Sequence, residues 1–407
     1  MRKPDTFTYL NPTDMIKSVR LVNFFSFGDC TIDLEPDLNV LVGINGSGKS
    51  NFLRAFQLLK AGMDGRLQEQ VAQWGGIISI WQKNAFPLAK KSQILLQFTV
   101  SSDSNTAWAD GYKGDVIYGI VITSHNNTEV IIGETLQRTD NKFYLSAIDG
   151  HVAVSEIAVA PPDLESLEMA GDGSELALPK IVGVVSGALS NFYHILRDFD
   201  IYRLFNTTED SPMRTTVRAT GVNKLLPNGD NMFQVLNTTG LKSTAAYDAI
   251  EAGLHDVNEH FQRFRMNVYG QGSVEFYLQE KGLETPIHAA QVSDGTLSYL
   301  CLLVALHQPG RGRVIIFDEP ERNLHPDMLL ELGKQFDQAS AQSQLLVTTH
   351  APGLLNQFPL RAVRVFEKDE NNQTQVRQFT EADFAGWYEA FAPGQMWRDG
   401  ALGGNRY

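Results

Sequence analysis

The sequence contains little cysteine. Only Cys30 and Cys301 occur among 407 residues, and they lie in apolar surroundings far apart along the chain. Two such thiols provide neither the framework of a disulfide-stabilised domain nor the paired spacing of a zinc site. We therefore expect both to be buried packing residues in a reducing compartment.

Long apolar runs are also missing. The longest one, YLCLLVAL at residues 299–306, is far shorter than the ~20 residues that a membrane-spanning helix needs. The first residues, MRKPDTFTYLNPTD, contain no apolar core of the length that a secretory signal requires. These two absences argue against a membrane protein and predict a cytoplasmic one.

Positive charge is scarce. Lys and Arg number 34 against 47 Asp and Glu, which gives a net charge of −13 at pH 7. This balance argues against a surface covered by basic residues that bind nucleic acid, although a local basic groove remains compatible with it. No internal repeat, low-complexity tract or sustained heptad pattern is present, so a long coiled-coil arm is excluded.

One short stretch carries a clear chemical signal. Residues 43–50, GINGSGKS, match the pattern G-x-x-x-x-G-K-[ST] at every position, between an apolar run and an amphipathic helix. The glycines let backbone N–H groups surround phosphate oxygens, and the helix dipole points at them. Lys49 would bridge the β- and γ-phosphates, and Ser50 would ligate Mg²⁺. A glycine-rich turn that matches by chance is the alternative, and it leaves the flanking strand and helix unexplained.

A second signal is the strand RVIIFDEP at 313–320, which ends in two carboxylates. Asp318 would hold Mg²⁺ through water, and Glu319, which projects differently, would orient or deprotonate the attacking water. Alone, this segment could equally be a strand that ends in a solvated acidic turn. The P-loop earlier in the chain favours the catalytic interpretation.

Two weaker signals lie close to this strand in sequence. QVSDGTLSYL (291–300) places Ser293 as the N-cap of a helix whose free N–H groups could bind an anion. LLVTTHAPGLL (345–355) ends a strand at His350, which could sense the γ-phosphate. Taken alone, the first is more often an ordinary capped core helix, and the second more often a structural histidine.

The remaining sequence predicts an α/β protein in three parts. Residues 16–180 would form an N-terminal ATPase lobe whose segment 93–158 consists of short β-rich runs, typical of an antiparallel sheet. Residues 181–285 would form a helical insert, with helices at 182–198 and 243–265. Residues 286–407 alternate helices and strands, which indicates a mainly parallel sheet covered by helices. Residues 161–176 are predicted to be a polar connection, and the tail a docked helix.

The order of these motifs resembles the ABC-type ATPase heads of the SMC and RecF group, and in particular the bacterial AAA_21 family. The blocks IKSVRLVNFFSFGDCTIDLEPDLNVLVGINGSGKSNFLRAF, SDGTLSYLCLLVAL, IIFDEPERNLHP and LLVTTHAPGLLNQF carry the resemblance, together with the tail WYEAFAPGQMWRDGALGG. It is strong over residues 16–62 and 285–402 and weaker over the insert between them.

The resemblance implies a role for each motif. Asp318 would support Mg²⁺, Glu319 would be the catalytic base, and His350 would be the switch histidine. Ser293 and Gly295 would contact the γ-phosphate bound to a second subunit, which gives a head-to-tail homodimer that shares two ATP molecules. ERNLHP at 321–326 would be the D-loop. The residues expected to contact ATP in the P-loop are Gly43, Asn45, Gly46, Ser47, Gly48, Lys49, Ser50 and Asn51.

Two departures from the family pattern are visible. The signature reads SDGT where the transporter-like motif reads SGGQ, so the contact of the second glycine is made differently or lost. The Q-loop glutamine is also not identifiable, because Gln82, Gln93 and Gln97 all qualify.

Three function classes compete for such an ATPase. A transporter ATPase would have a smaller insert and a more regular signature. A RecF-like repair ATPase would need a basic DNA-facing surface. A defence-type ATPase would regulate a separately encoded effector, such as a nuclease or toxin, and residues 369–407 are too few for an effector domain of its own. We favour the third class, with nucleic acid left open as a partner and no membrane. Arg214 and Arg218 could bind an anion or a partner, but we expect both to be solvated charges in a loop.

Overall fold

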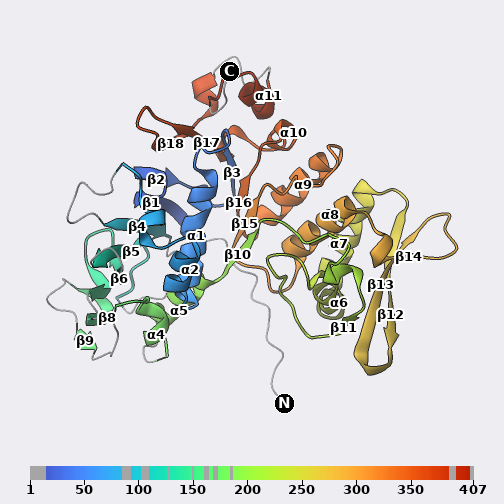
Figure 1. Ribbon diagram of the computed structural model, residues 1–407, viewed down its shortest axis with the longest axis horizontal. Coiled ribbons are helices and arrows are strands. Elements are labelled where there is room, and N and C mark those ends of the chain that lie inside the picture. Colours follow the sequence, from blue (N-terminus) through green and yellow to red (C-terminus); the bar gives the residue numbers. More distant parts are fainter. Residues whose placement is uncertain are drawn as a thin grey trace. The chain divides into compact units, whose positions relative to one another are not determined.

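The computed structural model describes residues 15–84, 93–101, 110–125, 129–148, 151–159, 165–167, 173–183, 187–384 and 391–403. Its contacts divide the chain into two compact units, which are described separately (Figure 1). Unit 1 comprises residues 1–199, 364–379 and 402–407, and unit 2 comprises residues 200–363 and 380–401. The predicted three-part division, which follows the motifs, stays a prediction.

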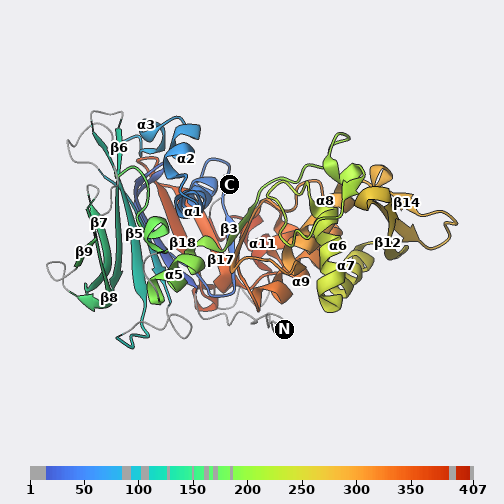
Figure 2. The same ribbon diagram turned by 90° about the horizontal axis from the view of Figure 1, so that it is seen from below.

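An eight-stranded antiparallel sheet forms one side of unit 1, in the order β2-β1-β4-β5-β6-β7-β8-β9 (Figures 1 and 2). The prediction of hairpins over 93–158 is confirmed, since each of these strands pairs antiparallel with the next. The strands are β1 (Ile16–Phe24), β2 (Phe27–Asp33), β4 (Ile94–Val100), β5 (Val116–His125), β6 (Glu129–Arg138), β7 (Phe143–Ile148), β8 (His151–Val159) and β9 (Glu165–Leu167).

Two local predictions in unit 1 are wrong. The connection at 161–176 contains β9, which pairs with β8 and extends the sheet. The sequence predicts a turn at Gly28 and Asp29, between strands at 18–27 and 30–43. The first hairpin instead turns at Phe25 and Ser26, because Phe24 and Phe27 are already cross-strand partners. Phe25 has a left-handed φ of 50°, and the centre of its ring lies 4.6 Å from the guanidinium of Arg54. Side-chain packing thus offsets a backbone conformation that a bulky residue rarely adopts.

The P-loop helix α1 (Lys49–Met63) packs on both sides through aromatic rings. Its Phe56 contacts Phe98 of β4, and its Phe52 contacts Phe366 of β17, each at a centroid distance of 5.8 Å. The apolar stripe predicted for this helix is therefore buried between two strands. The other elements of unit 1 are α2 (Leu67–Gln73), α3 (Ile77–Ile80), α4 (Leu178–Ile181), α5 (Ala188–Arg197), β3 (Leu38–Val42), β17 (Val363–Lys368) and β18 (Thr374–Gln378).

A parallel strand pair forms the centre of unit 2. β15 (Val314–Asp318) and β16 (Gln344–Thr348) run in the same direction and are connected by α9 (Met328–Ser340). Both strands are apolar and almost fully buried, as expected for parallel strands covered by helices. Tyr202, the last residue of β10 (Phe199–Tyr202), stacks on Phe317 of β15 at 5.5 Å. α8 (Asp294–His307) is buried from Leu297 to Leu306.

The insert of unit 2 is less helical than predicted. The expected helix over 243–265 ends at Val257 as α7 (Thr244–Val257), and β12 (Phe261–Tyr269) begins soon after it. β12 pairs antiparallel with β13 (Ser273–Glu280), and the short strands β11 (Val217–Arg218) and β14 (Ile287–His288) complete a small sheet. Phe276 of this sheet stacks on Phe233 of α6 (Met232–Lys242) at 4.2 Å.

The tail contains the short helix α11 (Pro393–Arg398), and Gly394 N donates a 2.8 Å hydrogen bond to Asn356 Oδ1 near the end of α10 (Pro352–Leu355). The docked helix predicted for the tail depends on apolar residues at 384, 387, 388 and 391, and residues 387 and 388 lie outside the described part of the chain. Among the described residues, none of the helices combines the length and apolar character needed to cross a bilayer.

Candidate functional site

The P-loop backbone follows a path that only glycine accepts without strain. Gly43, Gly46 and Gly48 have φ values of 149°, 83° and 117°. A Cβ atom at Gly43 would lie 2.4 Å from the Phe366 carbonyl oxygen, and one at Gly48 would lie 2.2 Å from Thr374 Oγ1. A Cβ at Gly46 would meet nothing within 4 Å. Tight packing therefore surrounds Gly43 and Gly48, whereas Gly46 borders open space.

Two polar side chains of the loop are poised for an anion. Lys49 is buried, and its Nζ donates to the carbonyl oxygens of Gly43 at 2.7 Å and Ile44 at 3.2 Å. Ser47 Oγ is buried and has no hydrogen-bond partner among the described residues. Such an orphaned buried hydroxyl next to a lysine, at a helix N-terminus, fits a nucleotide phosphate. Ser50 is exposed at the first turn of α1, where its hydroxyl could coordinate a metal ion.

Hydrogen bonds from two residues outside the motif, Ser26 and Thr374, hold the P-loop in place. Thr374 Oγ1 lies 2.8 Å from the Ser47 carbonyl oxygen and 2.7 Å from Ser26 Oγ. Asn51 Nδ2 donates to the same Ser26 hydroxyl at 2.9 Å. Thr374 and Ser26 were not predicted from the sequence, because they are far from the motif along the chain.

The acidic strand end of unit 2 is held by the neighbouring strand. Thr348 Oγ1 donates a 2.7 Å hydrogen bond to Asp318 Oδ1, and Thr348 lies opposite Asp318 in the parallel register. Arg203 Nε approaches the other carboxylate oxygen of Asp318 at 3.3 Å. Asp318 is thus oriented by β16, as a carboxylate that is to support a cation must be.

Glu319 leaves the strand in a left-handed conformation, with φ 56°. Its N–H is directed at Thr348, 2.9 Å from the hydroxyl oxygen and 3.2 Å from the carbonyl oxygen. This turn explains why Glu319 projects differently from Asp318. The Glu319 carboxylate contacts His350 Nε2 at 3.4 Å and Arg322 Nε at 2.6 Å. Strain in a non-glycine residue of this kind is common at active sites.

Glu321, the first residue of the predicted D-loop, reaches back to the strand that carries His350. Its Oε1 accepts hydrogen bonds from Thr349 Oγ1 and from the His350 backbone N–H, both at 2.8 Å. Its Oε2 is buried without a partner among the described residues. Burial raises the pKa of the Glu321 carboxyl despite these two donors. No pattern in the sequence indicates this role of Glu321.

The predicted signature residues lie at an exposed helix start. Ser293 caps α8, and its Oγ accepts a 3.1 Å hydrogen bond from the Thr296 N–H. A Cβ atom at Gly295 would lie 2.9 Å from the Asn323 carbonyl oxygen, so the glycine lets the D-loop approach. Ser293 is exposed. Within unit 2, the signature and the D-loop are therefore in contact.

A small pocket in unit 2 borders the acidic strand end. Its lining includes Asp318, Glu319 and Asn323, together with Tyr202, Arg203 and Phe205. Two of the predicted site residues of unit 2 therefore border the pocket, and His350 adjoins it through its contact with Glu319. The P-loop residues belong to unit 1, where they form the phosphate cradle described above.

The expectation of solvated loop charges is wrong for Arg214 and consistent with Arg218. The side chain of Arg214 is only 9% exposed and is hydrogen-bonded on every side, whereas Arg218 is exposed on β11. Among the Q-loop candidates, Gln82 is buried, Gln93 is exposed and Gln97 is half-buried in β4. Their assignment stays a prediction.

Comparison with solved structures identifies the fold. An Smc head bound to the C-terminal winged-helix domain of ScpA aligns with a TM-score of 0.57 and 12% sequence identity, over 91% of this chain and 99% of that chain. An Smc head with an extended coiled coil, bound to the C-terminal domain of ScpA derived from Pyrococcus furiosus, aligns with a TM-score of 0.60 and 10% identity, over 92% and 99%. The chain has the fold of an ABC-type ATPase head, as its motifs predicted, and the described residues form no long coiled coil.

The family follows from the sequence. The model of the AAA_21 family, described as "AAA domain, putative AbiEii toxin, Type IV TA system", matches residues 38–356. The chain belongs to this family. No curated protein matches it.

Proposed function

We propose that this ABC-type ATPase head binds ATP with Mg²⁺ and hydrolyses it. The observation that carries this proposal is the arrangement at the end of β15. There Glu319, in a left-handed conformation, has its carboxylate 3.4 Å from His350 and separate from the strand-held carboxylate of Asp318. Two neighbouring carboxylates in different environments suit two different roles, metal support and general base.

The residues of this chain would divide the work as follows. Lys49 and the backbone N–H groups at the start of α1 would bind phosphate oxygens, and Ser50 with Asp318 would hold Mg²⁺. The bound ion would neutralise charge on the phosphates. Glu319 would accept the proton of the attacking water, and His350 would contact the transferred phosphoryl group and orient Glu319.

The Glu319→Gln variant tests the general-base role. It should bind ATP with unchanged affinity and lose steady-state turnover by a factor of about 10²–10⁴, the usual contribution of a general base. The control is Glu370→Gln, which changes an exposed carboxylate in the turn between β17 and β18. Full turnover in the Glu319→Gln protein would exclude Glu319 as the base.

We further propose a head-to-tail dimer in which Ser293 and Gly295 complete the ATP site of the other protomer. The start of α8 supports this role, since Ser293 is exposed there and the N-terminus of a helix favours an anion. Two shared sites related by a two-fold axis close such an assembly. Sedimentation of the Glu319→Gln protein with and without Mg-ATP tests it, and a monomer at saturating nucleotide would contradict the shared-site arrangement.

The dimer would act as a sensor or scaffold that regulates a separately encoded effector, a nuclease or toxin, in anti-phage defence. Two facts support a partner-dependent role. The family description refers to a toxin system, and the Smc heads of similar fold were solved with ScpA bound. Affinity capture of the Glu319→Gln protein from its native cells, with Lys49→Ala as the control that does not bind ATP, tests this role. A nuclease-like or toxin-like protein captured only with Glu319→Gln would support it, and its absence would count against it.

A RecF-like nucleic-acid ATPase is the second candidate, and one feature of the insert favours it. Arg218 and Tyr269 lie opposite Ser273, and Arg265 lies opposite Tyr277, so all share one face of the small sheet. This face is opposite to the one that packs on α6, and its arginines are exposed. Basic side chains beside aromatic rings suit single-stranded nucleic acid. Two exposed arginines, Arg218 and Arg265, thus share this face with Glu275, which accepts a 2.6 Å hydrogen bond from the Tyr277 hydroxyl.

Fluorescence anisotropy with a labelled single-stranded oligonucleotide tests this second candidate. The Arg218→Glu/Arg265→Glu variant should lose salt-dependent binding. Arg66→Glu, which reverses an exposed charge in unit 1, should retain it. Equal binding by both variants would remove this sheet face from consideration.

A further inference from the structure

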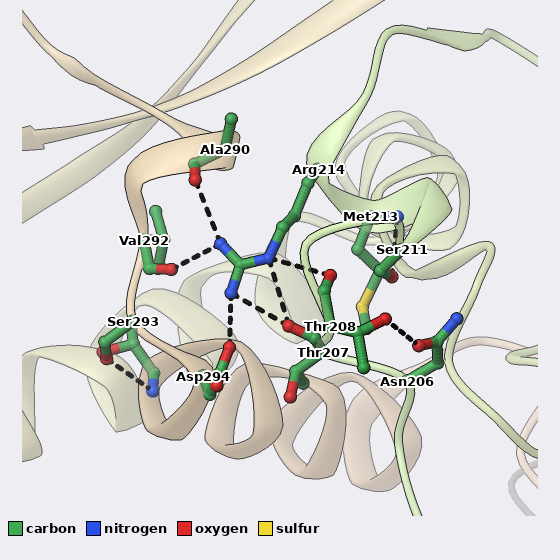
Figure 3. A network of polar contacts seen from close by, with 11 residues as sticks. Asn206, Thr207, Thr208, Ser211, Met213, Arg214, Ala290, Val292, Ser293 and Asp294 are labelled. Atoms are coloured by element: carbon green, nitrogen blue, oxygen red, sulfur yellow. Dashed lines mark hydrogen bonds and ion pairs between the residues drawn. The ribbon is translucent and has the colours of Figure 1, made fainter.

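Arg214 is the most extensively hydrogen-bonded arginine of the insert (Figure 3). It ends the short turn Pro212–Arg214, which Ser211 caps by accepting a 3.2 Å hydrogen bond from Met213 N. Met213 is fully buried, and its sulfur lies 3.4 Å from Cys301 Sγ in the middle of α8. The backbone that carries Arg214 is thus anchored against the helix that begins at the signature.

The guanidinium joins two separate segments to the start of that helix. On one side, Nε and Nη2 donate to the carbonyl oxygen of Thr207 at 3.1 and 3.0 Å, and Nε also lies 3.2 Å from that of Thr208. On the other side, Nη1 donates to the carbonyl oxygens of Ala290 at 3.1 Å and Val292 at 2.7 Å. Nη2 also donates to Asp294 Oδ1 at 2.5 Å. Figure 3 shows these contacts converging on one planar group.

This arrangement depends on arginine. A guanidinium presents five N–H donors in a fixed planar fork, whereas an ammonium offers three on a flexible stem. The carbonyl oxygens of Ala290 and Val292 belong to the turn that leads directly into Ser293. Asp294 is the next residue, and its side chain is 63% exposed. The two residues on either side of Ser293 are therefore both held by Arg214.

We propose that Arg214 is a positioning residue of the shared ATP site. It fixes the turn before α8 so that Ser293 and Gly295 present the helix start to the nucleotide of the second protomer. This assignment rests on the proposed dimer. It also explains the departure from the transporter-like signature: the second position carries Asp because its carboxylate is bound by Arg214, and the motif is held from within the chain.

A purely structural role would have a different consequence. If Arg214 only stabilised unit 2, its loss would lower the melting temperature. It would then weaken nucleotide binding at the P-loop and dimer formation alike. As a positioning residue, Arg214 acts on ATP-driven dimer formation, and nucleotide binding at the P-loop of the same chain is independent of it. The two readouts separate the two roles.

The experiment uses the full chain in the Glu319→Gln background. Sedimentation as a function of Mg-ATP concentration gives the ATP needed for half-maximal dimer formation, and titration with a fluorescent ATP analogue gives binding at the P-loop. With Arg214→Met, the ATP needed for dimer formation should rise about tenfold or more, equivalent to 1.4 kcal/mol per factor of ten. Analogue binding by the monomer should be unchanged. The control Arg66→Met, which removes an arginine whose side chain is 61% exposed, should stay within about twofold.

Two further variants keep the test decisive if Arg214→Met does not fold. Arg214→Lys retains the charge without the fork, and Asp294→Asn alters only an exposed partner. Each should weaken dimer formation, and Arg214→Lys combined with Asp294→Asn should cost less than the sum of the two, because both disrupt one contact.

The outcomes separate the two proposals. A Glu319→Gln parent that does not dimerise with Mg-ATP overturns the shared-site function itself. A parent that dimerises, with Arg214→Lys and Asp294→Asn variants that dimerise at the same ATP concentration, overturns the role of Arg214 alone.

Discussion

Thr348 donates a 2.7 Å hydrogen bond to Asp318, and the same hydroxyl oxygen lies 2.9 Å from the backbone nitrogen of Glu319. One hydroxyl on β16 therefore fixes both acidic residues at the end of β15. This contact orients the carboxylate expected to support Mg²⁺ and stabilises the left-handed turn that directs Glu319 away from the strand.

The Thr348→Val substitution removes this hydroxyl and keeps the side-chain shape. Hydrogen bonds to charged groups contribute about 1.5–3 kcal/mol, so ATP turnover should fall roughly 10- to 100-fold. ATP affinity should change little, because Thr348 lies outside the P-loop. Steady-state kinetics and nucleotide titration measure the two effects. Thr348→Ser, which retains the hydroxyl, is the control, and equal turnover in the Val and Ser variants would contradict the role given to this contact.

The P-loop glycines should respond unequally to alanine. Both Gly46 and Gly48 have positive φ, so either substitution introduces backbone strain of about 1–3 kcal/mol. Only at Gly48 would the new Cβ also collide with Thr374. Gly48→Ala should therefore lower the melting temperature further than Gly46→Ala and should abolish nucleotide binding. Thermal melting and ATP titration of the two variants test this order, and equal melting temperatures would contradict it.

Glu321 should make stability depend on pH. Burial raises its pKa above the ordinary value of 4.5, so the folded state binds this proton more tightly than the unfolded state does. The contribution of Glu321 to stability is therefore most favourable below 4.5 and declines as the pH rises through the higher folded-state pKa. Melting temperatures of the native protein and Glu321→Gln, measured from mildly acidic to neutral pH, should diverge. The native protein should lose stability relative to the variant as the pH rises, and parallel curves would contradict this.

The two cysteines should react slowly while the chain is folded. Burial raises the pKa of Cys30 to about 11 and that of Cys301 further, and the thiolate is the reactive form. Iodoacetamide should therefore modify neither thiol at neutral pH until a denaturant is added, when both should react. Mass spectrometry of the alkylated protein gives the count. Rapid modification of Cys301 in the native protein would mean that α8 opens readily.

The parts of the site that the sequence could predict are contiguous in it. A P-loop, a strand that ends in two acidic residues and a capped helix are each defined by neighbouring residues, and they fold locally as predicted. The contacts that orient them are not local. Thr374 reaches Ser47 across 327 positions, and Arg214 reaches Asp294 across 80. Such partners depend on strand register and loop packing, which no single segment encodes.

The errors in secondary structure have a similar origin. Phe261 and Phe264 are three positions apart, a spacing that continues the helical pattern of α7, yet both are buried in β12. Pairing with β13 decides the outcome, because the whole of β12 gains cross-strand hydrogen bonds there. The turn at Phe25 was missed because a bulky residue with positive φ needs the packing of Arg54 and Trp74 to be tolerated.

The segment Arg203–Thr208 has one arginine contact at each end. Its first side chain binds Asp318, and its last two carbonyl oxygens are bound by Arg214, which also binds Asp294. It connects the carboxylate expected to support Mg²⁺ with the start of α8, and Asn206 between them is hydrogen-bonded to Asn228 and Asp230. A displacement at Asp318 would be transmitted along this segment as far as those hydrogen bonds let it move. If ATP binds as proposed, a change at the nucleotide site would in this way reach the surface that the chain would offer to a second protomer.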